Sequence, residues 1–204
     1  ELRTLTGLGT REVVLSGVHL GSYGHDLGQR RGLASLIHRV LAETDVERLR
    51  LSSLEPWDLD ADFFALFDDP RLLPHLHLPL QSGCDTTLRR MARKTTVARF
   101  AELVEAARRS VEDVSITTDV MIGFPGETDA EFETSLATVE SLGFSKLHVF
   151  SYSRREGTPA DRLPDHIASE VKSERSGRTR EVSNRLDLCF YPPIGVLVMP
   201  VLWE

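Results

Sequence analysis

The sequence predicts an α/β fold built on a parallel sheet. Short apolar segments alternate with amphipathic helical patterns, and the apolar segments recur every 27 to 40 residues, which is the period of βα units. Hydrophobic residues make up 41% of the 204-residue chain and charged residues 27%, the balance of a globular protein with a sizeable core. Five such units without an obvious terminal cap indicate most of a (β/α) barrel or an open α/β sheet.

Five strands and three helices are expected from these patterns. The strands are predicted at residues 12–16, 46–53, 75–78, 114–122 and 146–152. Apolar stripes at helical spacing predict helices over residues 33–41 and 97–107. Thr128 and Glu131 have the spacing of a capping box, so a third helix begins there, and Gly143 is well placed to end it.

The pattern changes after residue 160. Residues 166–188 have helical propensity, but the stretch between Val171 and Val182 is polar apart from Gly177, which predicts a solvated connector. The apolar run at 196–203 is expected to begin a new β element. The predicted division is therefore a partial barrel at 1–160, a helical connector at 161–190 and the start of a further β domain at 191–204.

Composition excludes several classes of protein. The net charge of −7 argues against a protein whose whole surface grips nucleic acid. The two distant cysteines, Cys84 and Cys189, exclude a disulfide scaffold and a four-cysteine metal site made by this chain alone. No apolar run approaches the roughly 20 residues of a membrane span, and no signal-peptide pattern opens the chain, so we expect a cytoplasmic protein with no membrane partner. The chain begins in mid-pattern without Met, and we expect a fragment.

Candidate site residues follow the predicted strands, because parallel α/β sheets carry their chemistry on loops at the carboxyl ends of the strands. Four loops carry glycines or ligand-like polar groups: residues 16–24, 52–57, 78–84 and 119–128. Each also has a purely structural interpretation, as a flexible turn, a helix cap or packed small residues. The last loop is the most specific signal. It is no P-loop, because the Gly-Lys-Ser/Thr ending is missing, but its backbone and the following helix N-terminus suit a nucleoside.

A metal site is a weaker hypothesis. His75 and His77 share one face of a predicted strand, but no third ligand stands at a matching strand end. Cys84 is expected to be a small packed residue.

Read in order, five stretches resemble the radical S-adenosylmethionine (SAM) methylthiotransferases, most closely the group acting on N6-threonylcarbamoyladenosine in tRNA. They are Val-Val-Leu-Ser-Gly-Val-His-Leu-Gly-Ser-Tyr-Gly at 13–24, Arg-Leu-Arg-Leu-Ser-Ser-Leu-Glu-Pro at 48–56, His-Leu-His-Leu-Pro-Leu-Gln-Ser-Gly at 75–83, Gly-Phe-Pro-Gly-Glu-Thr at 123–128 and His-Val-Phe-Ser-Tyr-Ser-Arg-Arg-Glu-Gly-Thr-Pro-Ala at 148–160. The end of the chain, residues 200–204, resembles the first strand of that family's RNA-binding TRAM domain, although residues 189–195 fit less well.

The resemblance implies a partial radical SAM barrel, missing its first strand, in an enzyme that transfers a methylthio group to C2 of the modified adenosine. It implies tRNA, SAM and an electron donor as partners, and SAM and two 4Fe–4S clusters as cofactors. The residues implied in binding SAM are Gly17, Ser53, Glu55, Gln81, Ser82, Gly123, Gly126 and Tyr152.

The chain departs from the family in two respects. The Cys-x3-Cys-x2-Cys loop that holds the SAM-cleaving cluster is not in it, and neither is the domain whose three cysteines hold the second cluster. Residues 2–8 resemble the end of the helix just after the cluster loop. The chain is therefore expected to contain no catalytic or metal-ligating residues, to bind no cluster and to be inactive alone.

A basic segment is a candidate contact for tRNA. Seven basic and two acidic residues give residues 89–109 a charge of +5, which is either a solvated helix face or a phosphate-contacting patch. The candidate contacts are Arg89, Arg90, Arg93 and Lys94, which follow the Gln81 loop and need not line the cofactor pocket. The alternative functions are a ribosomal-protein methylthiotransferase, a coproporphyrinogen-oxidase-like radical SAM enzyme, or a non-catalytic RNA-binding barrel.

Overall fold

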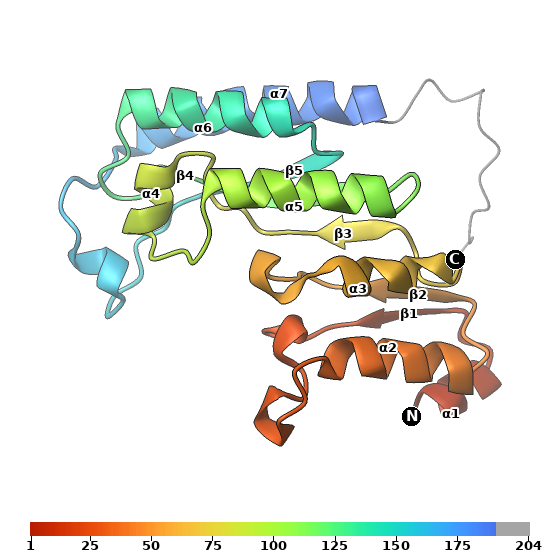
Figure 1. The fold of residues 1–204 in the computed structure, drawn as a ribbon. Helices are drawn as coiled ribbons and strands as arrows, with labels where there is room; N and C mark the ends of the chain where they lie inside the picture. Colours follow the sequence, from red (N-terminus) through yellow and green to blue (C-terminus); the bar gives the residue numbers. More distant parts are fainter. Residues whose placement is uncertain (191–204) are drawn as a thin grey trace.

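The computed structural model describes residues 1–190, and within them five strands run parallel to one another (Figure 1). Strands β1 and β2 pair with each other, and β3, β4 and β5 form a second ladder in that order. A parallel bridge between Leu49 and Leu72 joins the two ladders. The bounds are Glu12–Leu15 (β1), Arg48–Leu51 (β2), His75–His77 (β3), Ser115–Ile122 (β4) and Lys146–Ser151 (β5). The expected α/β fold is confirmed, and every predicted strand is present.

Helices connect the strands, and α2, α3, α5 and α6 form a layer beside the sheet (Figure 1). The α-helices are Leu2–Gly7 (α1), Gly32–Glu43 (α2), Ala61–Phe64 (α3), Asp85–Arg90 (α4), Val97–Ser110 (α5), Asp129–Leu142 (α6) and Ser169–Phe190 (α7). Short 3-10 helices are Leu20–Ser22 (η1), His25–Leu27 (η2), Pro56–Asp58 (η3), Ala65–Asp68 (η4) and Pro159–Arg162 (η5).

The predicted ends of α6 are confirmed. Thr128 Oγ1 accepts from the Glu131 backbone N–H at 3.2 Å, and Glu131 Oε2 accepts from the Thr128 N–H at 2.9 Å, which is a complete capping box. Gly143 ends the helix in the left-handed region, at a φ of 60°. Two further acceptors at this end are satisfied from α5, because Arg108 donates to the carbonyls of Leu142 and Gly143.

The core lies between this helix layer and one face of the sheet. Leu49 and Leu51 of β2 are buried while Arg48 and Arg50 alternate with them on the opposite face, as predicted. The Phe100 ring is fully buried. Burying one such side chain contributes about 1.5–3 kcal/mol, so this face holds the strands in register.

Helix α7 differs from its prediction. It packs on β5 and α6, and Arg175, Ser176, Thr179, Val182 and Ser183 are buried. Its polar side chains form hydrogen bonds with backbone groups at the sheet edge. For example, Ser183 Oγ accepts from the Leu147 N–H at 3.0 Å. The expectation of a solvated helix is wrong. The polar face of α7 is buried because its side chains find hydrogen-bond and ion-pair partners in the rest of the fold.

The domain division at residues 160 and 190 stays a prediction, and the TRAM-like strand expected at 191–204 lies outside the described residues. In the described part of the chain, no helix is both long and apolar enough to cross a bilayer.

Candidate functional site

The loops that follow the five strands share one end of the sheet, on the left of Figure 1. Backbone hydrogen bonds join neighbouring loops: the Ser52 N–H donates to Leu15 O at 2.9 Å, the Leu54 N–H to His77 O at 3.0 Å, and the Tyr152 N–H to Ile122 O at 2.8 Å. Gly17, Ser53, Gln81 and Gly123 therefore lie at the same end, as the strand pattern predicted.

The loops after β1 and β2 are held together by Asp58. Its Oδ2 lies 3.0 Å from His19 Nε2, and the carboxylate packs so tightly on Gly21 that a Cβ there would lie 2.1 Å from it. Glycine at position 21 is thus required for the two loops to approach. The contact shapes the loop that carries Gly17.

Glu55 anchors the next loop by an ion pair. Its Oε2 accepts from Arg93 Nη2 at 2.8 Å, and the same nitrogen donates to Pro79 O at 2.8 Å. The Arg93 guanidinium also lies 5.2 Å from the centre of the Trp57 ring. Arg93 therefore holds two strand-end loops together and pairs with Glu55, one of the residues implied in binding SAM.

Gln81 continues the edge of β3 in an unusual conformation. Its φ is 74°, the left-handed region, and its backbone bonds to β4 on both sides through Asp119 O and the Met121 N–H, each at 2.8 Å. A non-glycine residue held there costs about 1–2 kcal/mol, which the two backbone bonds offset. Ser82 is turned away toward α6: its Oγ is buried, bonds Ser135 Oγ and accepts from the Cys84 N–H.

The loop after β4 is organised by Glu127, which is 3% exposed. Its Oε2 accepts from the Gly123 N–H at 2.9 Å and from Arg175 Nη1 at 2.8 Å. Burial raises the pKa of Glu127, while the bonds from Gly123 and Arg175 act the other way. Gly123 and Gly126 both have positive φ, 73° and 77°, so the turn depends on glycine at both positions.

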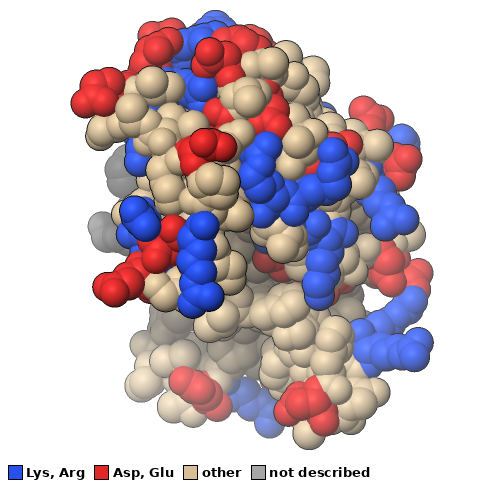
Figure 2. All heavy atoms as spheres, turned by 90° about the vertical axis from the view of Figure 1, so that its left-hand side faces the viewer, with Lys and Arg blue, Asp and Glu red and all other residues tan. Residues whose placement is uncertain are grey.

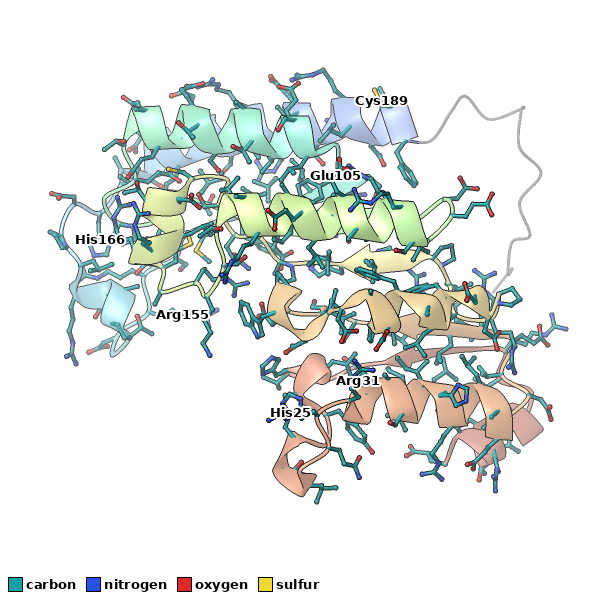
Figure 3. All side chains as sticks on the ribbon, in the orientation of Figure 1. His25, Arg31, Glu105, Arg155, His166 and Cys189 are labelled. Carbon is teal, nitrogen blue, oxygen red and sulfur yellow. The ribbon has the colours of Figure 1, made fainter. Side chains whose placement is uncertain are left out.

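An aromatic cluster follows β5. The buried Tyr152 ring meets Phe124 edge to face, with ring centres 5.4 Å apart, and the centre of the His166 ring lies 6.0 Å from that of Tyr152. Figure 3 shows His166 and Arg155 on the segment beyond β5, at the same end as the strand-end loops. Tyr152 OH and Ser52 Oγ are buried with no hydrogen-bond partner in the described part of the chain. These two hydroxyls are free to bind a polar ligand.

The face of the sheet opposite the helices is polar. His77 Nδ1 lies 2.8 Å from Thr117 Oγ1, its Nε2 lies 3.3 Å from Asp119 Oδ1, and its ring meets His148 at 5.3 Å between centres. His75 lies beside them, with Nε2 3.4 Å from Thr117 Oγ1. Within residues 1–190, no group of three or more His, Cys, Asp or Glu is placed to hold a metal ion, so His75 and His77 gain no third ligand.

His75 should make the fold sensitive to mild acid. Burial, followed by Arg50, His77 and His148, lowers its pKa from 6.5 to about 4, so the neutral ring is favoured in the folded state. Its contribution is complete above pH 6.5 and is lost as the pH falls through 4. The full shift equals about 3 kcal/mol, which solvent screening reduces to roughly 1–2 kcal/mol.

We therefore expect His75→Gln to flatten the loss of unfolding free energy between pH 7 and pH 4 by that amount, measured by urea denaturation at both pH values. An equal loss in both proteins would contradict this assignment.

The basic segment divides between the two ends of the sheet. Arg89 and Lys94 are exposed, whereas Arg90 bonds Glu131 at 2.7 Å and is half-buried, like Arg93. Figure 2 looks onto the strand-end face and shows Lys and Arg side chains gathered near its middle. Arg108 and Arg109 close the far end of α5 and do not belong to this surface. Arg89, Arg90, Arg93 and Lys94 lie at the strand-end face, and so does Arg155 (Figure 3).

Three side chains of this region were not found from the sequence. Trp57 carries Arg93 and Lys94 over its ring, at 5.2 and 5.9 Å, and is 40% exposed. Arg175 and Lys172 reach the loops after β4 and β5 from α7. The spacing of Lys172, Arg175 and Thr179 places them on one helix face and could have indicated this contact. Because the face is polar, however, it produces no hydrophobic periodicity.

Comparisons with known proteins assign the fold. Residues 1–139 match the model of the radical SAM superfamily. Coproporphyrinogen III oxidase from Escherichia coli, a radical SAM enzyme, superposes with a TM-score of 0.70 at 16% identity, over 87% of this chain and 41% of that one. The radical SAM methyltransferase TsrM from Kitasatospora setae gives 0.59 at 16% identity, over 78% and 31%.

Curated relatives at higher identity are tRNA-modifying enzymes. The threonylcarbamoyladenosine tRNA methylthiotransferase MtaB of Thermotoga maritima is 43% identical over 86% of this chain and 40% of its own length. The tRNA-2-methylthio-N6-dimethylallyladenosine synthase of Acetivibrio thermocellus is 38% identical over 91% of this chain and 39% of its own length. The chain thus spans about two fifths of the length of these relatives.

Proposed function

The chain belongs to the radical SAM superfamily, and we propose that it is the cofactor-binding part of an enzyme that transfers a methylthio group to a modified adenosine in tRNA. The observation that carries the proposal is 37–43% identity to methylthiotransferases over most of the chain, and it is supported by the loops at 16–24, 52–57, 78–84 and 119–128, which lie at one end of the parallel strands. Likeness to coproporphyrinogen III oxidase rests on 16% identity and supports the fold alone.

The residues at the strand ends fit SAM. The Gly17 loop would approach its methionyl end, and Ser53, Glu55 and Gln81 would bind its polar groups. Ser82 would support the Gln81 loop from the side that faces α6. Gly123, Gly126 and Tyr152 would shape the adenine site, where the buried Tyr152 OH has no hydrogen-bond partner in the described part of the chain. When bound, SAM and its iron–sulfur cluster supply the radical that starts the reaction. The role of this chain would be to bind SAM and orient it.

The cysteines of the described part do not fit a 4Fe–4S cluster. Cys84 is buried before α4 and Cys189 is exposed near the end of α7, and a cluster needs several thiolates on one side of a cavity. We therefore assign both clusters of the proposed enzyme to cysteines outside this sequence. The electron donor would act there.

Among modified adenosines, we propose N6-threonylcarbamoyladenosine. The Gly-Val-His-Leu-Gly-Ser-Tyr and Leu-Ser-Ser-Leu-Glu-Pro stretches support it, as does the 43% identity to the Thermotoga maritima enzyme. Relatives acting on dimethylallyladenosine match nearly as well, at 37–38%, so the experiment must separate the two substrates. tRNA would meet the strand-end face at Arg89, Lys94 and Trp57, with Arg90 and Arg93 behind them, and the reaction would take place in the cytoplasm.

The test is nucleoside analysis of tRNA from cells in which the gene is deleted and then restored. We expect 2-methylthio-N6-threonylcarbamoyladenosine to disappear on deletion and to return on complementation, with 2-methylthio-dimethylallyladenosine unchanged. Loss of the second nucleoside in place of the first would assign the other substrate. Loss of neither would refute methylthio transfer to tRNA.

A further inference from the structure

We propose that helix α7 positions the loop after β4, residues 123–128. Its Arg175 and Lys172 hold this loop and the loop after β5 in the shape that binds the cofactor. The inference rests on the proposed function for the identity of the ligand. Helix α7 spans Ser169–Phe190 and lies beyond the residues matched by the superfamily model, which end at 139.

Arg175 acts on the loop through Glu127. Its Nη1 donates to Glu127 Oε2 at 2.8 Å and to Glu127 O at 3.1 Å, and its Nη2 donates to Asp129 Oδ1 at 2.6 Å. The same Oε2 of Glu127 accepts from the Gly123 N–H at 2.9 Å. One guanidinium therefore fixes the carboxylate that closes the turn between the two glycines.

Lys172 reaches the same loop one turn earlier on the helix. A Cβ at Gly123 would lie 2.3 Å from Lys172 Cγ, so the lysine stem packs directly on that glycine. Its Nζ donates to Tyr152 O at 3.1 Å, and Ser176 Oγ lies 3.0 Å from Ser151 Oγ. Since 172, 175 and 176 share one helix face, α7 contacts both loops at once.

The burial of this contact shows that it is more than a surface ion pair. The side chains of Arg175 and Glu127 are 6% and 2% exposed. Apolar replacement of a buried ion pair often leaves a fold as stable as before, so packing alone does not require charges here. Only the charged pair holds the Glu127 carboxylate in a fixed position, where it accepts a hydrogen bond from the Gly123 N–H. Arg175 is thus a positioning residue, since it acts through Glu127.

The structure offers a matched control three residues along. Arg178 pairs with Glu133 through two bonds of 2.7 and 2.8 Å, and its guanidinium lies 5.0 Å from the Phe132 ring, as that of Arg175 does at 5.3 Å. It contacts neither strand-end loop in these interactions. Arg178→Met therefore removes a more exposed ion pair, with side chains 40% and 54% exposed, from the same helix without touching the turn.

The experiment compares Arg175→Met, the double variant Arg175→Met/Glu127→Leu and Arg178→Met in this chain. Amide hydrogen exchange at 123–127 reports the turn directly, and titration with S-adenosylhomocysteine reports the site. For Arg175→Met we expect about tenfold faster exchange at Gly123 and about tenfold weaker binding. Arg178→Met should match the parent protein in both. The double variant should recover thermal stability but neither exchange protection nor affinity.

Two results would overturn the proposal: unchanged exchange and affinity in Arg175→Met, or full recovery of both in the double variant. Failure of the proposed function gives a different result, because the parent chain would then bind no S-adenosylhomocysteine. Exchange at Gly123 would still decide the positioning role in that case.

Discussion

Replacing Gly83 with valine should destabilise the fold by about 3 kcal/mol or more, since overpacking a well-packed site by even small groups costs roughly 1–3 kcal/mol. A Cβ at this position would lie 2.6 Å from Ser135 O and 2.7 Å from Thr138 Cβ, both on α6. The clash involves helix backbone, which cannot turn aside as a flexible side chain can. Valine carries two methyl groups beyond the Cβ, and these increase the clash.

The consequence would reach the site as well as the core. The Gly83 N–H donates to Ser135 Oγ at 2.8 Å, and this bond seats the loop carrying Gln81 against α6. Pushing α6 away would break the bond and release Gln81 from its left-handed conformation. Guanidinium denaturation measures the stability loss, and amide exchange at Gln81 measures the release.

A second glycine provides a control of opposite sign. Gly177 lies inside α7, and a Cβ there would meet nothing within 4 Å. Gly177→Ala should stabilise the chain by roughly 0.5–1 kcal/mol, because alanine loses less backbone entropy in a helix. Equal effects of the two glycine substitutions would show that the close approach of α6 is not what Gly83 provides.

The sheet and three helices were predictable because their signals are local. Alternation placed β2, with Leu49 and Leu51 inward, and the Thr128–Glu131 spacing placed the start of α6. Parallel pairing then followed from the βα period, and with it the shared end of the candidate residues. None of this required knowledge of contacts between distant side chains.

The polar contacts were not predictable for the opposite reason. Helix α7 buries a polar face, so its sequence lacks the apolar stripe by which a core helix is found. Its partners Glu127 and Tyr152 are separated from Arg175 and Lys172 by 48 and 20 residues. The hydrogen bond between Ser82 and Ser135 likewise joins residues 53 positions apart. Such pairings depend on tertiary geometry.

Reversing two charges on the strand-end face should weaken tRNA binding by about tenfold or more, because each phosphate contact contributes a little under one unit to the slope of log affinity against log salt. The structure selects Arg89 and Lys94. Both are exposed, whereas Arg90 and Arg93 are held by Glu131 and Glu55, so their reversal would also damage the fold. Arg89→Glu/Lys94→Glu isolates binding from stability.

The control keeps the change in net charge and moves it to the other end of the sheet. Arg11 and Arg109 are 62% and 70% exposed, and each makes one surface ion pair of 3.4 Å, with Glu47 and Glu105. Arg11 precedes β1 and Arg109 lies in the last turn of α5, so both are remote from the strand-end loops. Arg11→Glu/Arg109→Glu should change tRNA affinity little, because exposed charges more than a Debye length away are largely screened.

Fluorescence anisotropy with labelled tRNA at several salt concentrations measures both affinity and slope. For Arg89→Glu/Lys94→Glu the slope should fall by about 1.5 units, the contribution of two lost phosphate contacts. Exposed Trp57 lies beside these cations, under Lys94 at 5.9 Å, and offers a ring on which a base can stack. Trp57→Ala should therefore weaken binding without altering the slope, since stacking releases no counterions. Equal weakening by the strand-end and control variants would mean that tRNA responds to net charge alone, and this face would not be its docking surface.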